Sequence, residues 1–298
     1  MSPNKKKIYL DNNATTPVDP RVLEAMLPYF TEKFGNASSV NHAFGWDAEE
    51  AVTIAREQVA RLIGARPKEI YFTSGATEAI NLALLGVCKA NADKGGHIIT
   101  CATEHKAVLD TCKELENRGF RVAYLDVGKS GALDLDVLDD TITDQTILVS
   151  LMYANNEIGV IHPLKEISKL TREKGVLLMT DATQAVGKIP FDVQELDVDL
   201  AAFSAHKIYG PKGIGGLYVR KRPKFDLSPL LFGGGQEKGL RPGTLNVPGI
   251  VGLGKACEIC AGEMSTESKR LRKWRDHLEA ELQDIEGLRI NGKNSPRL

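Results

Sequence analysis

Apolar residues in the first third of the chain recur with the spacings of helices and short strands. Between residues 47 and 64 they lie three or four positions apart, and Gly64 ends the run. This spacing predicts a helix that packs one face on a core. The apolar run over 69–73 predicts a short strand, and small residues at 74–76 lead from it into an alanine- and leucine-rich helix.

The same alternation continues through the middle of the chain. Further strands are predicted over 97–100, 122–125, 147–152, 176–179, 201–203 and 216–219. Further helices are predicted over 105–118, 134–142 and 163–174. Strands that alternate with helices indicate an α/β fold, with a mostly parallel sheet covered by helices on both faces. Ligands of such sheets bind at the carboxyl ends of the strands.

The last part of the chain predicts the beginning of a further layer. A glycine run at 233–235 predicts a loop. A final helix then carries apolar residues three and four positions apart, namely Leu271, Trp274, Leu278, Leu282 and Ile285. A possible strand follows at 288–290. We therefore expect a large domain over 16–260 and an incomplete small α+β domain made of 1–15 and 261–298.

Composition favours a small-molecule substrate in the cytoplasm. Apolar residues make up 42% and charged residues 26% of the 298 residues, which is ordinary for a globular protein. The formal net charge of -1 gives no electrostatic reason to expect a nucleic acid or an anionic membrane as partner. No signal peptide or transmembrane-length apolar run is present, and the five cysteines are scattered and expected to be reduced.

Common nucleotide and metalloprotease motifs are missing from the sequence. No predicted strand is followed by G-x-G-x-x-G, and H-E-x-x-H does not occur. Gly128-Lys129-Ser130 has the tail of a P-loop, but Ala123 stands where that motif needs its first glycine. A solvated turn accounts for this segment.

The strongest local signal surrounds Lys207. It lies in Ser204-Ala205-His206-Lys207-Ile208-Tyr209-Gly210-Pro211-Lys212-Gly213, directly after the strand that ends at Phe203. A lysine at this edge of the sheet can be partly desolvated, which leaves its amine neutral and nucleophilic. A solvated surface lysine is the ordinary alternative.

Two further positions suit an aromatic phosphate cofactor. Asp181 ends the strand over 176–180, where its carboxylate could hold a pyridinium nitrogen protonated, as pyridoxal 5'-phosphate (PLP) requires; a helix N-cap is the alternative. Ala76 and Thr77 open a helix after a strand, and N–H groups at a helix N-terminus suit a phosphate, with simple capping as the alternative.

Two more strand ends offer polar side chains. His105 opens a helix and could stack on a planar ring or move protons, although a lone histidine is more often structural. Asn155 and Asn156 offer amide donors, with loop chemistry as the alternative. Each signal is weak alone. Together they supply a covalent lysine, a pyridinium partner, a phosphate cradle and a stacking ring at one edge of the sheet.

Seven motifs in chain order strengthen this hypothesis. They are Tyr9-Leu10-Asp11 with Ala14-Thr15-Thr16-Pro17, Thr73-Ser74-Gly75-Ala76-Thr77-Glu78, Thr103-Glu104-His105-Lys106, Asn155-Asn156-Glu157-Ile158-Gly159, Asp181-Ala182-Thr183-Gln184, the Lys207 segment, and Gly233-Gly234-Gly235-Gln236-Glu237. With them the chain resembles the cysteine desulfurases of iron–sulfur cluster assembly, IscS- and NifS-like PLP enzymes related to class V aminotransferases. The resemblance covers essentially the whole chain and implies the PLP-dependent transferase fold type I.

The resemblance also implies roles for individual residues. The phosphate ligands would be Ala76, Thr77, Ser204 and His206. Around the ring, His105 would stack, Asp181 would pair with the pyridine nitrogen, Gln184 with the ring hydroxyl, and Asn156 would lie beside cofactor and substrate. Lys207 would carry the cofactor as a Schiff base, and Lys207 and His105 would be the catalytic residues. No metal is implied.

A threonine after an Arg-x-Gly loop reaches the neighbouring subunit's phosphate in this family. It corresponds to Thr244 here, so the resemblance implies a homodimer, although Pro242 replaces the usual small residue of that loop. The implied partners are L-cysteine and an iron–sulfur scaffold or another sulfur-acceptor protein.

Two family residues have no match in this sequence. We expect the nucleophilic cysteine, which takes sulfur as a persulfide, and the arginine that binds the substrate carboxylate to lie beyond Leu298. We expect Cys257 and Cys260 to pack in the core, with a metal or redox role as the alternative. Cys101 is the one candidate for a substitute nucleophile.

The expected reaction is the conversion of L-cysteine to L-alanine with transfer of sulfur to a cysteine thiolate, and we expect the 298-residue chain to desulfurate poorly. Alternatives are a selenocysteine lyase, a class V aminotransferase, or a catalytically incomplete fragment with a binding role.

Overall fold

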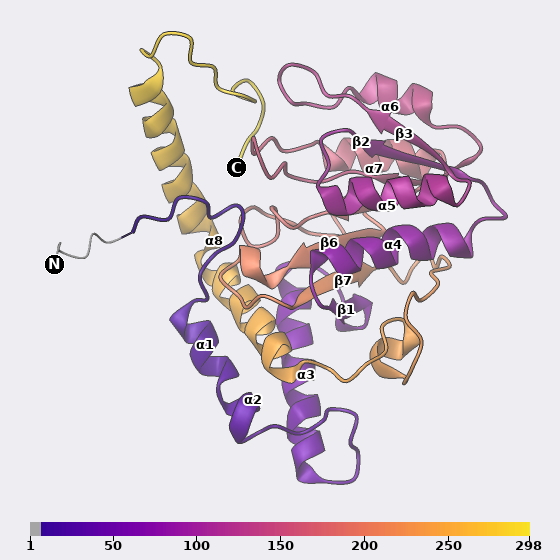
Figure 1. The fold of residues 1–298 in the computed structure, drawn as a ribbon, viewed down its shortest axis with the longest axis vertical. Helices are drawn as coiled ribbons and strands as arrows, with labels where there is room; N and C mark the ends of the chain where they lie inside the picture. Colours follow the sequence, from indigo (N-terminus) through magenta and orange to yellow (C-terminus); the bar gives the residue numbers. More distant parts are fainter. Residues whose placement is uncertain (1–6) are drawn as a thin grey trace.

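One seven-stranded sheet forms the centre of the molecule in the computed structural model, which describes residues 7–298 (Figure 1). The strands are β1 (Ile70–Thr73), β2 (His97–Cys101), β3 (Arg121–Leu125), β4 (Thr146–Ser150), β5 (Leu177–Asp181), β6 (Leu200–Ser204) and β7 (Gly215–Val219). Their order across the sheet is β1-β7-β6-β5-β4-β2-β3. Every residue of β2, β4, β6 and β7 is buried, as expected of strands covered on both faces.

The predicted parallel arrangement is confirmed, with β7 as an antiparallel exception. The strands from β6 through β5, β4 and β2 to β3 are parallel to their neighbours, whereas β7 pairs antiparallel with both β1 and β6. Only a short turn over 205–214 joins β6 to β7. A parallel neighbour would need a crossover of a dozen or more residues, so this turn permits only the antiparallel direction.

Helices cover both faces of the sheet. They are α1 (Pro20–Met26), α2 (Pro28–Thr31), α3 (Ala43–Leu62), α4 (Ala76–Ala90), α5 (Lys106–Asn117), α6 (Leu135–Thr141), α7 (Leu164–Glu173) and α8 (Val247–Leu282). The helices α4 and α5 lie side by side on one face and enclose one apolar cluster (Figure 1). A second cluster on the opposite face takes in α1, α3, α6, α7 and the first half of α8.

The outer edge of β1 is closed by side chains. The Glu237 carboxylate accepts from the Phe72 N–H at 2.8 Å, and Arg56 Nη1 donates to the Ile70 carbonyl at 2.7 Å. Arg56 and Glu237 also form an ion pair with two hydrogen bonds, of 2.9 and 2.6 Å. The Ile70 carbonyl and the Phe72 N–H are therefore satisfied without another strand.

Helix α8 is longer than the sequence pattern predicts at its start and shorter at its end. Its first half packs on the core beside α3, with Cys257 fully buried, whereas Leu271, Trp274 and Leu278 on its second half are exposed. Figure 1 shows this second half extending away from the sheet. The helix ends at Leu282, so Ile285 lies in a turn rather than on the helix.

The predicted strand over 288–290 is wrong. These residues have no regular structure, because no described strand lies beside them to pair with. The chain instead returns further on to the loop after β4, where Ile161 N–H donates to the Pro296 carbonyl at 2.8 Å and Leu298 N–H to the Gly159 carbonyl at 2.9 Å.

The division into a large domain over 16–260 and a small one from 1–15 and 261–298 stays a prediction. Residues 1–6 lie outside the described residues, and α8 runs without a break through position 260. Residues 13–16 pack directly on the sheet edge described below. No helix within 7–298 is long and apolar enough to cross a membrane.

Candidate active site

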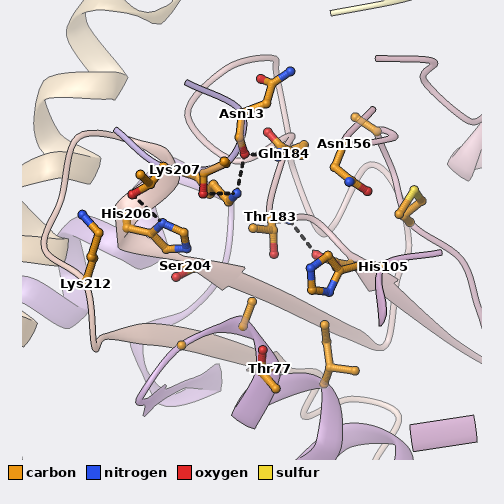
Figure 2. Close-up of a pocket in the computed structure, with 18 of the residues that line it drawn as sticks. Asn13, Thr77, His105, Asn156, Thr183, Gln184, Ser204, His206, Lys207 and Lys212 are labelled. Atoms are coloured by element: carbon orange, nitrogen blue, oxygen red, sulfur yellow. Dashed lines mark hydrogen bonds between the residues drawn. The ribbon is translucent and has the colours of Figure 1, made fainter. Parts of the chain in front are cut away.

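A cavity of about 1030 Å³ opens at the carboxyl ends of the central strands (Figure 2). All of the predicted cofactor-binding residues except Thr244 line it: Ala76, Thr77, His105, Asn156, Asp181, Gln184, Ser204, His206 and Lys207. These side chains come from segments more than a hundred residues apart in sequence. The parallel strands bring them together because each strand ends at the same edge of the sheet.

Lys207 lies in a single 3-10 turn, Ala205–Lys207, directly after β6. Its Nζ donates to the carbonyls of Asn13 and Ala14, the second at 2.8 Å. Partial burial lowers the pKa of the Lys207 ammonium, and the negative charges of Asp181 and Asp11 oppose that effect. A larger share of the amine is therefore neutral than in a solvated lysine, which is the state that attacks a carbonyl.

The N-terminus of α4 offers uncapped backbone N–H groups to the cavity. Its N-cap is Gly75, so no side chain caps the helix, and Thr77 is not the capping residue that the alternative interpretation required. A Cβ at Gly215 would lie 2.7 Å from the Gly75 Cα, so only glycine lets β7 approach this turn so closely. The buried Ser204 also lines this end of the cavity.

The negative charge of Glu78, in the first turn of α4, is balanced by an ion pair with Arg241. Glu78 accepts from the Ser74 N–H at 2.6 Å and pairs with Arg241 Nε at 2.7 Å. These contacts lower the pKa of Glu78, although burial opposes them. The ion pair also ties the turn before α4 to the loop that carries Thr244.

Asp181 ends β5 and is buried beneath the cavity. Its Oδ1 accepts from the Thr183 N–H at 2.9 Å, and a turn rather than a helix follows, so the predicted alternative of a helix N-cap is wrong. Burial raises the pKa of Asp181, whereas the hydrogen bond from the Thr183 N–H and the positive charge of Lys207 act in the opposite direction. The carboxylate lines the cavity, where it can meet a ligand.

His105 is the N-cap of α5. Its Nδ1 accepts from the Ala107 N–H at 3.0 Å. Because a backbone N–H can only donate, Nδ1 must carry the lone pair, and the proton of the neutral ring lies on Nε2. The helix cap thus fixes both the tautomer and the orientation of a ring that lines the cavity.

The two neighbouring asparagines have different surroundings. Asn155 is buried and organises its loop, since its Oδ1 accepts from the N–H groups of Glu157 and Ile158 at 2.9 and 3.0 Å. Asn156 lines the cavity and donates to Glu157 Oε1 at 2.9 Å. Asn155 therefore has the structural role in its loop that was the alternative to ligand binding, whereas Asn156 is placed to contact a ligand.

Gln184 and His206 both contact the N-terminal segment. Gln184 Nε2 donates to the Asn13 carbonyl at 3.0 Å, and its Oε1 accepts from Lys188. His206 Nδ1 lies 3.1 Å from Thr15 Oγ1, and burial lowers the pKa of His206. Figure 2 shows Asn13, Gln184 and Lys207 grouped on one side of the cavity.

Thr244 lies elsewhere. It is exposed on the loop after the glycine run and does not line the cavity of its own chain. The prediction that it reaches a neighbouring subunit therefore stays untested. Cys101 is buried and does not line the cavity either, and burial raises the pKa of its thiol.

Sequence reasoning missed the parts of the wall that come from the N-terminal segment. Asn13, Ala14 and Thr15 line the cavity and contact Lys207, Gln184 and His206. The signal was present, because this segment belongs to the first of the seven motifs, but nothing in its own pattern assigns it a role. Thr183 and Lys212 line the cavity as well.

Comparison with known proteins gives the same family throughout. A family model described as "Aminotransferase class-V" matches residues 8–298. The chain is 56% identical over 295 residues to a cysteine desulfurase IscS of Anaeromyxobacter sp. (strain Fw109-5), covering 99% of this chain and 73% of that one. It is 58% identical over 275 residues to the IscS of Rickettsia massiliae (strain Mtu5), covering 91% of this chain and 67% of that one.

Solved structures agree with these relatives. A NifS-like protein has a TM-score of 0.94 at 44% identity, covering 98% of this chain and 80% of that one. SspA, solved in complex with cysteine, has a TM-score of 0.82 at 43% identity, covering 85% of this chain and 72% of that one. The predicted PLP-dependent fold type I is thereby confirmed. The chain belongs to the class V aminotransferase family of PLP-dependent enzymes, within its cysteine desulfurase group.

Proposed function

We propose that this chain binds PLP through Lys207 and catalyses the desulfuration of L-cysteine to L-alanine. One observation carries the proposal: a partly desolvated lysine, a buried carboxylate and an uncapped helix N-terminus face one cavity at the carboxyl ends of the strands. The cysteine desulfurase relatives and the cysteine-bound SspA structure support this choice of substrate.

The donor set fits the cofactor. The uncapped N–H groups of α4, with Thr77, Ser204 and His206, suit a phosphate dianion. The buried carboxylate of Asp181 on the cavity wall suits a protonated ring nitrogen. The buried Thr183 hydroxyl on the cavity wall has no partner among residues 7–298. An orphaned polar atom of this kind is explained by a bound polar ligand.

When bound, PLP withdraws electrons from the substrate's α-carbon through its protonated ring. Asp181 would keep that ring nitrogen protonated, because a buried carboxylate is stabilised by an adjacent cation. Lys207 would hold the cofactor covalently, and its amine, once free, would be placed to carry a proton to or from the substrate's α-carbon. His105 would lie against the ring and donate from Nε2.

The thiol that accepts sulfur is proposed to be none of the five cysteines in this sequence. Cys88, Cys101, Cys112 and Cys257 are buried. Burial raises the pKa of Cys88 and Cys112 to about 12 and of Cys260 to about 11. A thiolate is the nucleophile in sulfur transfer, so these thiols are held in the unreactive form. All five are free, which supports a reducing location such as the cytoplasm.

We further propose that the enzyme works as a homodimer and passes sulfur to an iron–sulfur scaffold or another acceptor protein. The exposed position of Thr244, outside the cavity of its own chain, supports a contact made across a subunit boundary. The same loop is held to the α4 turn through Arg241 and Glu78. A position fixed in this way suits a residue that must reach a ligand.

Lys207→Ala tests the covalent role of the lysine. We expect the wild-type chain to form an adduct with PLP that borohydride reduces, and the variant to form none, because Lys207 would supply the amine of that bond. Mass spectrometry of the reduced protein gives the readout. Lys165→Met, on the exposed surface of α7, is the matched control. A reducible adduct that persists in Lys207→Ala refutes the assignment.

Product analysis tests the reaction. With L-cysteine and an added thiol reductant we expect alanine and sulfide in equal amounts, at a low rate, because the chain's own thiols are buried. A keto acid with pyridoxamine phosphate would indicate an aminotransferase instead. A clear preference for selenocysteine would indicate a lyase of that substrate.

A further inference from the structure

Lys188 is a half-buried lysine to which the reaction assigns no role. It follows Gln184 by four residues in the turn after β5 and donates from Nζ to Gln184 Oε1. Gln184 is buried, and its Nε2 donates to the Asn13 carbonyl at 3.0 Å. Lys207 donates to the same carbonyl. A short chain of hydrogen bonds thus connects Lys188, Gln184 and the covalent lysine.

The contact with Lys188 fixes one end of the Gln184 amide, and the Asn13 carbonyl contacts the other end. An ammonium donates and cannot accept, so the carbonyl end of the amide must lie toward Lys188. The NH₂ end then lies toward the Asn13 carbonyl, which lines the cavity and can only accept. Without Lys188, only that carbonyl would oppose a half-turn of the amide, which would present an acceptor oxygen on the Asn13 side in place of the NH₂ group.

The turn that carries Lys188 is packed too tightly to move easily. Gly187 has φ +73°, and a Cβ there would lie 2.8 Å from Ile208 Cγ2 and 2.9 Å from Cys260 Sγ. Burial, together with the positive charge of Lys207, lowers the pKa of Lys188 to about 8. Burying an ammonium costs free energy, which here is offset in part by the bond to Gln184.

We propose that Lys188 is a positioning residue of the cofactor site, which fixes the Gln184 side chain with its NH₂ donors toward the ring hydroxyl of bound PLP. This inference rests on the proposed function, since it concerns the same site. Lys188 itself would not touch the cofactor. It would act by excluding the amide orientation in which an oxygen faces the ring oxygen.

The test titrates apo-protein with PLP and records both the apparent affinity and the visible absorption of the bound cofactor. We expect Lys188→Met to weaken PLP binding about tenfold, the usual effect of losing one charge-assisted hydrogen bond. Its spectrum should change in the same direction as that of Gln184→Ala. Lys188→Arg, which keeps the donor, should recover most of the affinity. Lys165→Met, an exposed lysine, should match the wild type.

A double variant separates positioning from packing. In the Gln184→Ala background, Lys188→Met should add little, because the residue through which it acts is gone. Gln184→Glu provides a variant that keeps Lys188 in place, and its second oxygen should reproduce the spectral change of Lys188→Met. The Gln184→Glu measurement tests the inference even if the Lys188→Met variant does not fold.

Three results would overturn the inference. They are an unchanged affinity and spectrum in Lys188→Met, an equal loss in both the wild-type and Gln184→Ala backgrounds, or a wild-type spectrum in Gln184→Glu. Failure of the proposed function has a different signature, because the wild-type chain itself would then bind no PLP.

Discussion

Glu104 is a carboxylic acid buried beside the residue that caps α5. Its Oε1 accepts from the Met152 N–H at 2.6 Å, and its Oε2 has no partner within residues 7–298. Burial raises the pKa of Glu104 well above its ordinary value, and the negative charge of Asp181 raises it further. The folded protein therefore favours the neutral acid form of Glu104, and Asp181 is the carboxylate that lines the cavity.

Glu104→Gln tests this protonation state. An acid whose pKa is raised by folding binds its proton more tightly in the folded chain, so wild-type stability falls as the pH rises above the ordinary value of 4.5. Glutamine cannot ionise, and its Oε1 can still accept from Met152. We expect the free energy of unfolding to favour the variant increasingly between about pH 5 and about pH 8.

Urea denaturation at several pH values provides the measurement. Glu24→Gln, on the exposed surface of α1, is the matched control for the loss of one carboxylate. A stability difference that stays constant with pH would show that Glu104 is ionised in the folded protein.

Single residues at strand ends could be predicted, whereas their long-range partners could not. Lys207 and Asp181 each follow a buried apolar run, so their place at the sheet edge can be read locally. Asn13 contacts Lys207 from 194 positions away, and no local pattern connects the two. The sequence pattern did not single out Lys188, because a single lysine in a turn is usually solvated, and only the structure shows its contact with the buried Gln184.

Among the elements, the buried strands and the helices between them follow the sequence pattern closely. Each is long enough, and covered completely enough, for its periodicity to be clear. The direction of β7 depends on the length of its connection to β6 rather than on the strand itself. The segment over 288–290 alternates like a strand, but alternation forms a strand only where a neighbour offers hydrogen bonds.

The ion pair between Arg56 and Glu237 gives a test at this scale. The Glu237 side chain is 1% exposed and that of Arg56 20%, so removal of one partner leaves a buried charge. We expect Arg56→Met to lower the free energy of unfolding by about 3 kcal/mol. The double variant with Glu237→Gln should lose less than the sum of the single losses. Urea denaturation measures all three.

An exposed pair provides the comparison. Lys169 and Glu173 lie 4.0 Å apart on α7 with both side chains solvated, so Lys169→Met should change stability by less than about 1 kcal/mol. Equal losses from Arg56→Met and Lys169→Met would mean that the pair at β1 contributes no more than a surface contact.

At the scale of the whole molecule, the proposed homodimer would complete each site with a residue from a second copy of the chain. Thr244 is exposed on a loop that two ion pairs hold, one through Glu237 and one through Arg241. If it contacts the phosphate of a neighbour, each cavity needs Lys207 from one subunit and Thr244 from the other.

Mixed dimers test that arrangement. A dimer of one Lys207→Ala subunit and one Thr244→Ala subunit has one cavity that lacks both residues and one that lacks neither. We expect Thr244→Ala alone to bind PLP about tenfold more weakly, and the mixed dimer to regain wild-type affinity in half of its sites. Borohydride reduction and mass spectrometry identify the labelled subunit. Weak binding in every site of the mixed dimer would show that Thr244 serves its own chain.

The closed edge of β1 has a consequence for how the protein behaves at high concentration. An open strand edge is a template on which another chain can add by backbone pairing, and such addition continues into aggregates. Arg56 and Glu237 occupy the backbone groups that such a chain would need. Their loss would therefore favour precipitation of otherwise folded protein, through a route that the unfolding free energy alone would not reveal.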